Sequence, residues 1–225
     1  MKKSKAKKVI TGVGITVGIL AIALFLVAKN FVAVAGTVTI TKYKLSGYTK
    51  PELLLAGSST MWKWSSAEED LKGYDIENVG VPGSVISDWD KWLDTLITPF
   101  EPEGILLYVG ANDIHIDGGS GEQAADDFEA LCGKIHTALP NTHIYAVSVY
   151  TIGSHPEYMP EDILFNERLE AFAEKNTYMS YIDVWTPLLD EDGKVRNEVY
   201  AKDLLHLSDE GYVVWTKAIR EVLDQ

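Results

Sequence analysis

The chain has 225 residues, of which 46% are apolar and 24% charged, which is typical of one well-buried globular domain and excludes a disordered or repetitive protein. The net charge is −13, and because residues 1–35 hold six lysines and no acid, residues 36–225 carry about −19. That field argues against nucleic acid as a partner and favours a neutral or cationic substrate. A single cysteine, Cys132, excludes an internal disulfide and zinc sites built from cysteine pairs.

The N-terminal segment combines a basic cluster with a long apolar run. Lysines crowd residues 1–8, and residues 9–28 are 20 residues without a charge, long enough as a helix of about 30 Å to cross a bilayer. The positive-inside rule then predicts a single-pass cell-membrane protein with residues 1–8 cytoplasmic and the acidic domain extracytoplasmic. The alternative is a signal segment cleaved after Ala35, since Ala33-Val34-Ala35 has the A-x-A form; the length of the run favours the anchor.

The polar stretch that follows shows some alternation. We interpret residues 29–50 as a juxtamembrane linker, with an edge strand as the alternative for residues 37–50. The domain proper is expected at residues 51–225.

From Pro51 onward, short apolar runs alternate with helical patterns. Strands are predicted at 52–57, 75–81, 104–110, 143–150 and 178–185, and helices at 59–72, 84–96 (with Ser84 as N-cap), 123–139, 161–175 and 208–223. Unbroken apolar strands separated by helices indicate a mainly parallel five-stranded sheet in a three-layer α/β/α sandwich of flavodoxin-like type. Active sites of such sheets form at the carboxyl ends of the strands.

Residues suited to acyl transfer stand at those strand ends. Ser59 follows the first strand and requires a base, which His206 can supply, while Asp203 lies close enough to fix the tautomer of His206. The backbone N–H groups of Ser59 and Gly83 and the side-chain amide of Asn112 are candidate oxyanion donors.

Together these motifs resemble the SGNH/GDSL hydrolase superfamily over about residues 52–225. The matching blocks are Gly57-Ser58-Ser59, the glycine Gly83, Gly110-Ala111-Asn112-Asp113 and Asp203-Leu204-Leu205-His206. The resemblance implies a serine ester hydrolase that acts through an acyl-enzyme on Ser59, with a small-molecule or glycan ester as substrate and no metal or cofactor. Ser58 and Thr60 replace the aspartate and leucine frequent in the family, which blurs the assignment of substrate.

Other readings stay open at this point. Taken singly, each residue has an ordinary structural explanation, as a helix cap, a turn or a packed histidine. Such explanations do not account well for all four blocks occurring together in this order. The same machinery would serve an extracytoplasmic O-acyltransferase, and the fold would serve a non-catalytic glycan-binding surface module. An α/β-hydrolase elbow is disfavoured, because Met61 stands where that motif needs glycine.

Four further residues carry weaker expectations. His115 is expected either to line the site or to lie exposed in a loop, and Cys132 to be a buried structural thiol. Trp62 and Trp64 follow the serine, but we expect neither to contact substrate.

Overall fold

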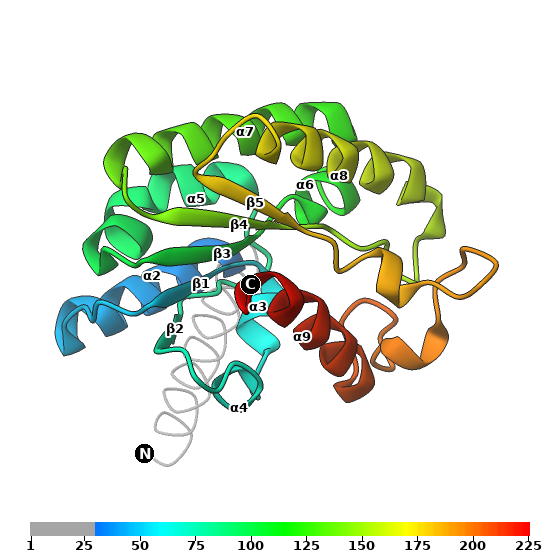
Figure 1. Ribbon diagram of the computed structural model, residues 1–225, viewed down its shortest axis with the longest axis horizontal. Helices are drawn as coiled ribbons and strands as arrows, with labels where there is room; N and C mark the ends of the chain where they lie inside the picture. Colours follow the sequence, from blue (N-terminus) through cyan, green and yellow to red (C-terminus); the bar gives the residue numbers. More distant parts are fainter. Residues whose placement is uncertain (1–29) are drawn as a thin grey trace, which may run out of the picture.

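The computed structural model describes residues 30–225 and shows a parallel sheet with helices on both faces (Figure 1). The strand order is β2-β1-β3-β4-β5, with β1 Leu53–Gly57, β2 Ile76–Asn78, β3 Gly104–Tyr108, β4 His143–Val147 and β5 Met179–Ile182. Every pairing is parallel, which confirms the predicted sheet. β1 and β3 are buried on both faces, as expected for central strands covered by helices.

The helices form two layers around this sheet. One face carries α5 (Ile86–Trp92), α7 (Gly121–Ala138) and α8 (Met159–Ala173), and α9 (Asp209–Leu223) lies on the other with the short helix α3 (Ser59–Lys63). Shorter elements are the helices α4 (Ala67–Asp70) and α6 (Ala111–His115) and a π-helical turn at Leu93–Ile97.

Two predicted helices differ in detail. The stretch 59–72 breaks into α3 and α4, because Trp64 ends α3 and its ring N–H donates to Asp70 at 2.7 Å, which folds the chain back. The N-cap prediction for Ser84 is wrong: α5 begins at Ile86, and the buried Ser84 hydroxyl instead accepts the Trp89 ring N–H at 3.0 Å.

The alternative prediction of an edge strand at residues 37–50 is wrong, whereas the juxtamembrane linker at 29–50 stays a prediction. Residues Phe31–Ser46 form helix α2, in which Gly36 lies against Trp92 of α5 and Tyr43 bonds to Glu77 of β2. Tyr43 is buried against Phe100 with ring centroids 4.9 Å apart, and its hydroxyl donates to the Glu77 carboxylate. The β-branched residues of this segment favour a strand locally, but these tertiary contacts override that preference.

No helix among residues 30–225 has both the length and the apolar character needed to cross a bilayer. The predicted basic tail at 1–8 and membrane segment at 9–28 lie outside the described residues. The alternative cleavage point, Ala35, lies inside α2, so cleavage there would remove the first turn of that helix.

Candidate functional site

The end of β1 places Ser59 at the carboxyl edge of the sheet. Gly57 has φ +152°, and a Cβ there would lie 2.1 Å from the carbonyl oxygen of Tyr108 on β3, so only glycine fits. The next N–H, that of Ser58, donates to that same oxygen at 3.0 Å. The chain then turns into α3, whose first residue is Ser59.

Ser59, His206 and Asp203 are connected by hydrogen bonds. His206 Nε2 lies 3.0 Å from Ser59 Oγ, and His206 Nδ1 lies 2.7 Å from Asp203 Oδ2. The His206 side chain is 14% exposed and that of Asp203 is 45% exposed. These two residues belong to the segment 201–207, which we call the base loop and which includes Leu204 at φ +52°.

Asp203 is held in place by its own loop. Its Oδ1 accepts the backbone N–H groups of Leu205 and His206, both at 3.0 Å. Partial burial of the carboxyl acts to raise its pKa, but the hydrogen bonds from the His206 ring and the two N–H groups outweigh burial and hold the pKa of Asp203 well below its usual range. The carboxylate is therefore ionised wherever His206 has to be oriented as a base.

Asn112 and Asp113, at the start of α6, hold the loop that carries Gly83. One N–H of the Asn112 amide donates to the Ser84 carbonyl at 2.9 Å, which leaves its second N–H for another acceptor. Both oxygens of Asp113 accept the Ile86 N–H, at 3.1 and 3.2 Å. We call residues 83–86 with Asn112 and Asp113 the clamp.

The Asp113 carboxyl is largely withdrawn from solvent. Burial raises the pKa of Asp113 to about 7, although the hydrogen bond from the Ile86 N–H acts in the opposite direction. The charge state of the clamp therefore changes within the neutral pH range.

Gly83 is the residue of the clamp that faces helix α2. Its φ of +79° lies in the left-handed region, and a Cβ there would lie 3.0 Å from Cγ2 of Val32. Its N–H donates no hydrogen bond to any of residues 30–225 and is therefore available to a bound oxygen. Helix α2 thus reaches the edge of the site, which the linker prediction did not foresee.

Tyr150 connects the serine and histidine segments, and the sequence did not single it out. Its buried hydroxyl lies 3.0 Å from Thr60 Oγ1 and 3.3 Å from the Leu205 carbonyl. Burial raises the pKa of Tyr150 to about 12, so it stays a neutral hydrogen-bonding group. Tyr212 adds a second support, because its hydroxyl donates to the Thr60 carbonyl at 2.8 Å. No local sequence signal marks these tyrosines, since their partners lie far away in the chain.

His115 follows neither of the two expectations set for it. Its side chain is buried, and its Nε2 lies 2.8 Å from Asp162 Oδ1 on α8. The other Asp162 oxygen accepts the Thr151 hydroxyl at 2.6 Å. This network ties α6, and so the clamp, to α8.

Cys132 and the two tryptophans that follow Ser59 differ in their exposure to solvent. Cys132 is buried, as expected for a structural thiol. Trp64 is buried, whereas Trp62 is 56% exposed beside the serine. The expectation that neither tryptophan contacts substrate stays a prediction.

A cavity of about 450 Å³ borders His206. Its wall combines apolar side chains with hydroxyls and both signs of charge, and it is formed by Lys63, Ser65, Ser66, Asp70, Ala201, His206, Leu207, Asp209, Tyr212 and Val213.

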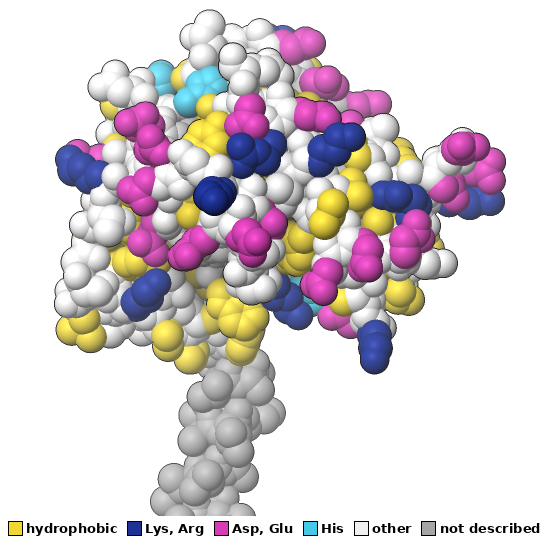
Figure 2. Space-filling model, turned by 60° about the horizontal axis from the view of Figure 1, so that its bottom comes forward, with side chains coloured by type: hydrophobic (Ala, Val, Ile, Leu, Met, Phe, Trp, Pro, Cys, Tyr) yellow, Lys and Arg dark blue, Asp and Glu magenta, His cyan; other side chains and the backbone are white. Residues whose placement is uncertain are grey.

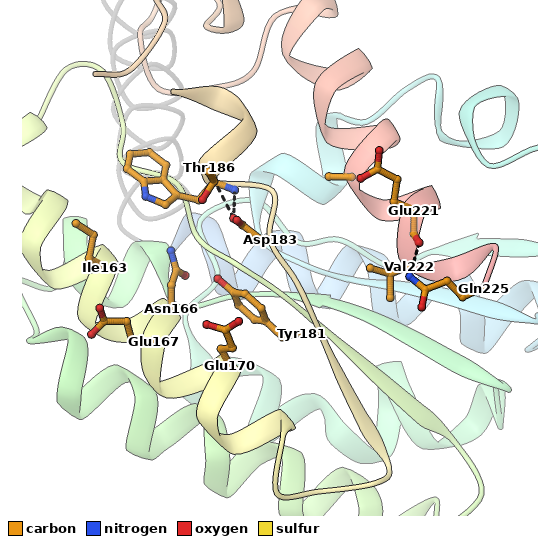
Figure 3. Close-up of a pocket in the computed structure, with 12 residues that line it drawn as sticks. Ile163, Asn166, Glu167, Glu170, Tyr181, Asp183, Thr186, Glu221, Val222 and Gln225 are labelled. Atoms are coloured by element: carbon orange, nitrogen blue, oxygen red, sulfur yellow. Dashed lines mark hydrogen bonds between the residues drawn. The ribbon is translucent and has the colours of Figure 1, made fainter. Parts of the chain in front are cut away.

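A second cavity, of about 590 Å³, lies against β5 and away from the serine (Figure 3). Acidic side chains from α8, α9 and the end of β5 surround it, namely Glu167, Glu170, Asp183 and Glu221. Asp183 Oδ1 already accepts the N–H groups of Trp185 and Thr186, at 2.9 and 3.0 Å. This cavity contains none of the residues that connect to Ser59.

Solved structures with the same fold come from several bacteria. One from Streptococcus pneumonia, described as a platelet activating factor, has a TM-score of 0.77, is 23% identical and covers 90% of this chain and 99% of its own. A GDSL-like lipase from Bacteroides thetaiotaomicron has a TM-score of 0.70 at 16% identity, covering 82% and 97%. A family 3 carbohydrate esterase from Clostridium thermocellum has a TM-score of 0.62 at 16% identity, covering 75% and 92%. At these identities the likeness shows the fold.

The family assignment comes from comparison of the sequence. A search of curated proteins found no match. The model of the GDSL-like lipase/acylhydrolase family matches residues 47–214, well over half of the chain and all four sequence blocks. The chain therefore belongs to the GDSL-like lipase/acylhydrolase family.

Proposed function

We propose that this protein is a serine ester hydrolase in which Ser59 is the nucleophile, His206 the base and Asp203 the residue that orients the base. The observation that carries the proposal is the hydrogen-bonded series from Ser59 Oγ through His206 to Asp203, with links of 3.0 and 2.7 Å. Serine is a weak nucleophile until a base takes its proton, and this geometry places a base in reach.

In the proposed reaction, Ser59 Oγ attacks the ester carbonyl while its proton passes to His206 Nε2. The developing oxyanion accepts hydrogen bonds from the N–H groups of Ser59 and Gly83 and from the free N–H of Asn112. His206 then gives its proton to the leaving alcohol, and an acyl-enzyme remains. Water, deprotonated by His206, attacks the acyl carbon and restores Ser59.

The surroundings of His206 support a polar alcohol as leaving group. The alcohol must lie beside Nε2 to receive its proton, and the cavity bordering His206 offers hydroxyls, carboxylates and an ammonium group. Beside its apolar part, such a wall offers hydrogen-bonding partners to a hydroxylated alcohol such as a sugar or glycerol. We further propose that the domain acts outside the cytoplasm, anchored through residues 9–28.

The direct test is hydrolysis of p-nitrophenyl acetate and its longer acyl homologues by the full chain, with Ser59→Ala as the matched variant. We expect the variant to lose about 10⁴-fold or more in kcat, because the nucleophile is gone. The acyl-length profile will separate an acetylesterase from a lipase.

Two outcomes would overturn the hydrolase assignment. Equal, negligible rates for both proteins would indicate a binding module with an unused site. Release of p-nitrophenol that depends on an added sugar acceptor, with the acyl group recovered on that sugar, would indicate an acyltransferase.

A further inference from the structure

Exposed apolar residues lie close in sequence to each of the proposed catalytic groups. Trp62 follows Ser59 by three residues, Ile116 follows Asn112 by four, and Leu204 and Leu205 directly precede His206. Phe31 adjoins Val32, the residue in contact with the Gly83 position. These five residues, all among the exposed large hydrophobic side chains, form what we call the apolar rim.

Helix α2 extends this apolar surface. Figure 2 shows hydrophobic side chains in a row over α2, along the lower edge of the molecule. The exposed members of α2 are Phe31, Val34, Val38 and Leu45. Helices of soluble domains normally turn such side chains inward, so a surface of this kind indicates a partner.

The length of the chain before α2 identifies that partner. The uncharged run 9–28 ends four residues before Val32. Four residues span at most about 14 Å even when fully extended. A bilayer that holds residues 9–28 would therefore lie within about that distance of Val32, and Val32 contacts the oxyanion glycine position.

The charges close to the rim also suit a lipid surface. The domain as a whole is strongly acidic, but next to the rim in sequence exposed lysines balance the acids, with Lys63 and Lys202 against Asp117 and Asp203. Tryptophan together with lysine is the combination that lies at the level of lipid headgroups.

We propose that the apolar rim docks on the surface of the bilayer that holds residues 9–28, so that the site takes ester substrates carried by lipids or lipid-linked molecules at that surface. This inference rests on the proposed hydrolase function and on the proposed anchor. It narrows the substrate class, since an ester far from the membrane would lie outside the reach of a site tethered so closely.

Trp62 provides a direct probe of docking. The chain has no tryptophan before residue 62, and of its six tryptophans Trp62 alone is classed as exposed. The full chain is reconstituted in vesicles of phosphatidylcholine that carry a nitroxide-labelled phosphatidylcholine. We expect the nitroxide to quench wild-type fluorescence markedly and Trp62→Phe much less. Equal quenching of the two proteins would overturn the docking.

A comparison of hydrolysis rates tests whether docking favours an ester carried by the membrane over a soluble ester. Acetate release from an acetylated diacylglycerol in the vesicles is divided by the rate on soluble p-nitrophenyl acetate. We expect Trp62→Ser combined with Ile116→Ser to lower this ratio about tenfold, because apolar contact with the lipid is lost. Ile163→Ser is the matched control, since Ile163 is also exposed but lies on α8 at the cavity beside β5, and it should leave the ratio unchanged.

The two measurements separate this inference from the hydrolase proposal. Quenching of Trp62 without activity on any ester would retain the docking and reject the hydrolase. Activity on soluble esters that Ser59→Ala abolishes, with no quenching and with the same ratio in rim variant and control, would retain the hydrolase and reject the docking.

Discussion

The base loop and the clamp meet at Ser59 but are built in opposite ways. The base loop is partly exposed, turns at positive φ through Leu204, and has Asp203 accept hydrogen bonds from two N–H groups of the same loop. In the clamp, Ser84 and Ile86 are buried, and both Asn112 and Asp113 bond to backbone groups 27 or 28 residues away. The difference teaches that proton transfer can be placed near water, whereas oxyanion donors need a rigid support within the fold. Changes in the base loop should therefore affect rate alone, and changes in the clamp should affect rate and stability together.

We expect Asp203→Asn to show the largest loss of catalytic rate with almost no loss of stability. Asparagine can still accept the two backbone N–H groups through its oxygen, but its amide nitrogen would face His206 Nδ1 and favour the wrong tautomer. We expect kcat to fall by about 10⁴-fold while the melting temperature stays within about 2 °C, because the carboxylate is half exposed. Kinetics on p-nitrophenyl acetate and a thermal melt provide the check. A large loss of stability would show that the base loop is a structural element like the clamp.

A smaller effect on rate, joined by an effect on stability, is expected for Asn112→Ala. The variant loses an oxyanion donor, which costs about 10²–10³ in kcat, and also the hydrogen bond to the Ser84 carbonyl. That second loss should lower the free energy of unfolding by about 1 kcal/mol. Denaturant unfolding beside the kinetic assay measures both. An unchanged rate with reduced stability would restrict Asn112 to a structural role.

The smallest effect concerns the pH dependence of stability through Asp113. Its pKa of about 7 in the folded protein exceeds the usual value of about 3.9, so between these pH values the folded state binds more protons than the unfolded state. The contribution of Asp113 to the free energy of unfolding is therefore greatest below about pH 4, declines as pH rises to about 7, and is constant above it. Urea unfolding across this range should show a steeper decline for the wild type than for Asp113→Asn. Parallel curves would place the Asp113 pKa near its ordinary value.

Local sequence patterns predicted most of the fold correctly. The strands at β1 and β3 are continuous apolar runs, and the order of the four blocks predicted that Ser59, Asp203 and His206 would meet at one edge of the sheet, as they do. The catalytic roles of these residues stay a prediction, because proximity does not measure turnover.

Contacts between distant residues account for what the sequence did not reveal. Helix α2 depends on Tyr43 meeting Glu77 and Phe100, and His115 is buried only because Asp162 arrives from α8, 47 residues later. The bridging role of Tyr150 likewise exists only after the sheet has formed. Neither periodicity nor motif spacing contains such information.

The cavity beside β5 has a consequence for self-association. β5 is an edge strand that pairs only with β4 among the described strands, so its outer backbone groups offer a template for another strand. The carboxylates of Glu167, Glu170, Asp183 and Glu221 line the cavity beside that edge. A second copy of the chain would bring the same charges to the same place, and we expect their repulsion to oppose pairing between the two edge strands. Protonation in acid or screening by salt would weaken this barrier, and aggregation through β5 should begin under those conditions.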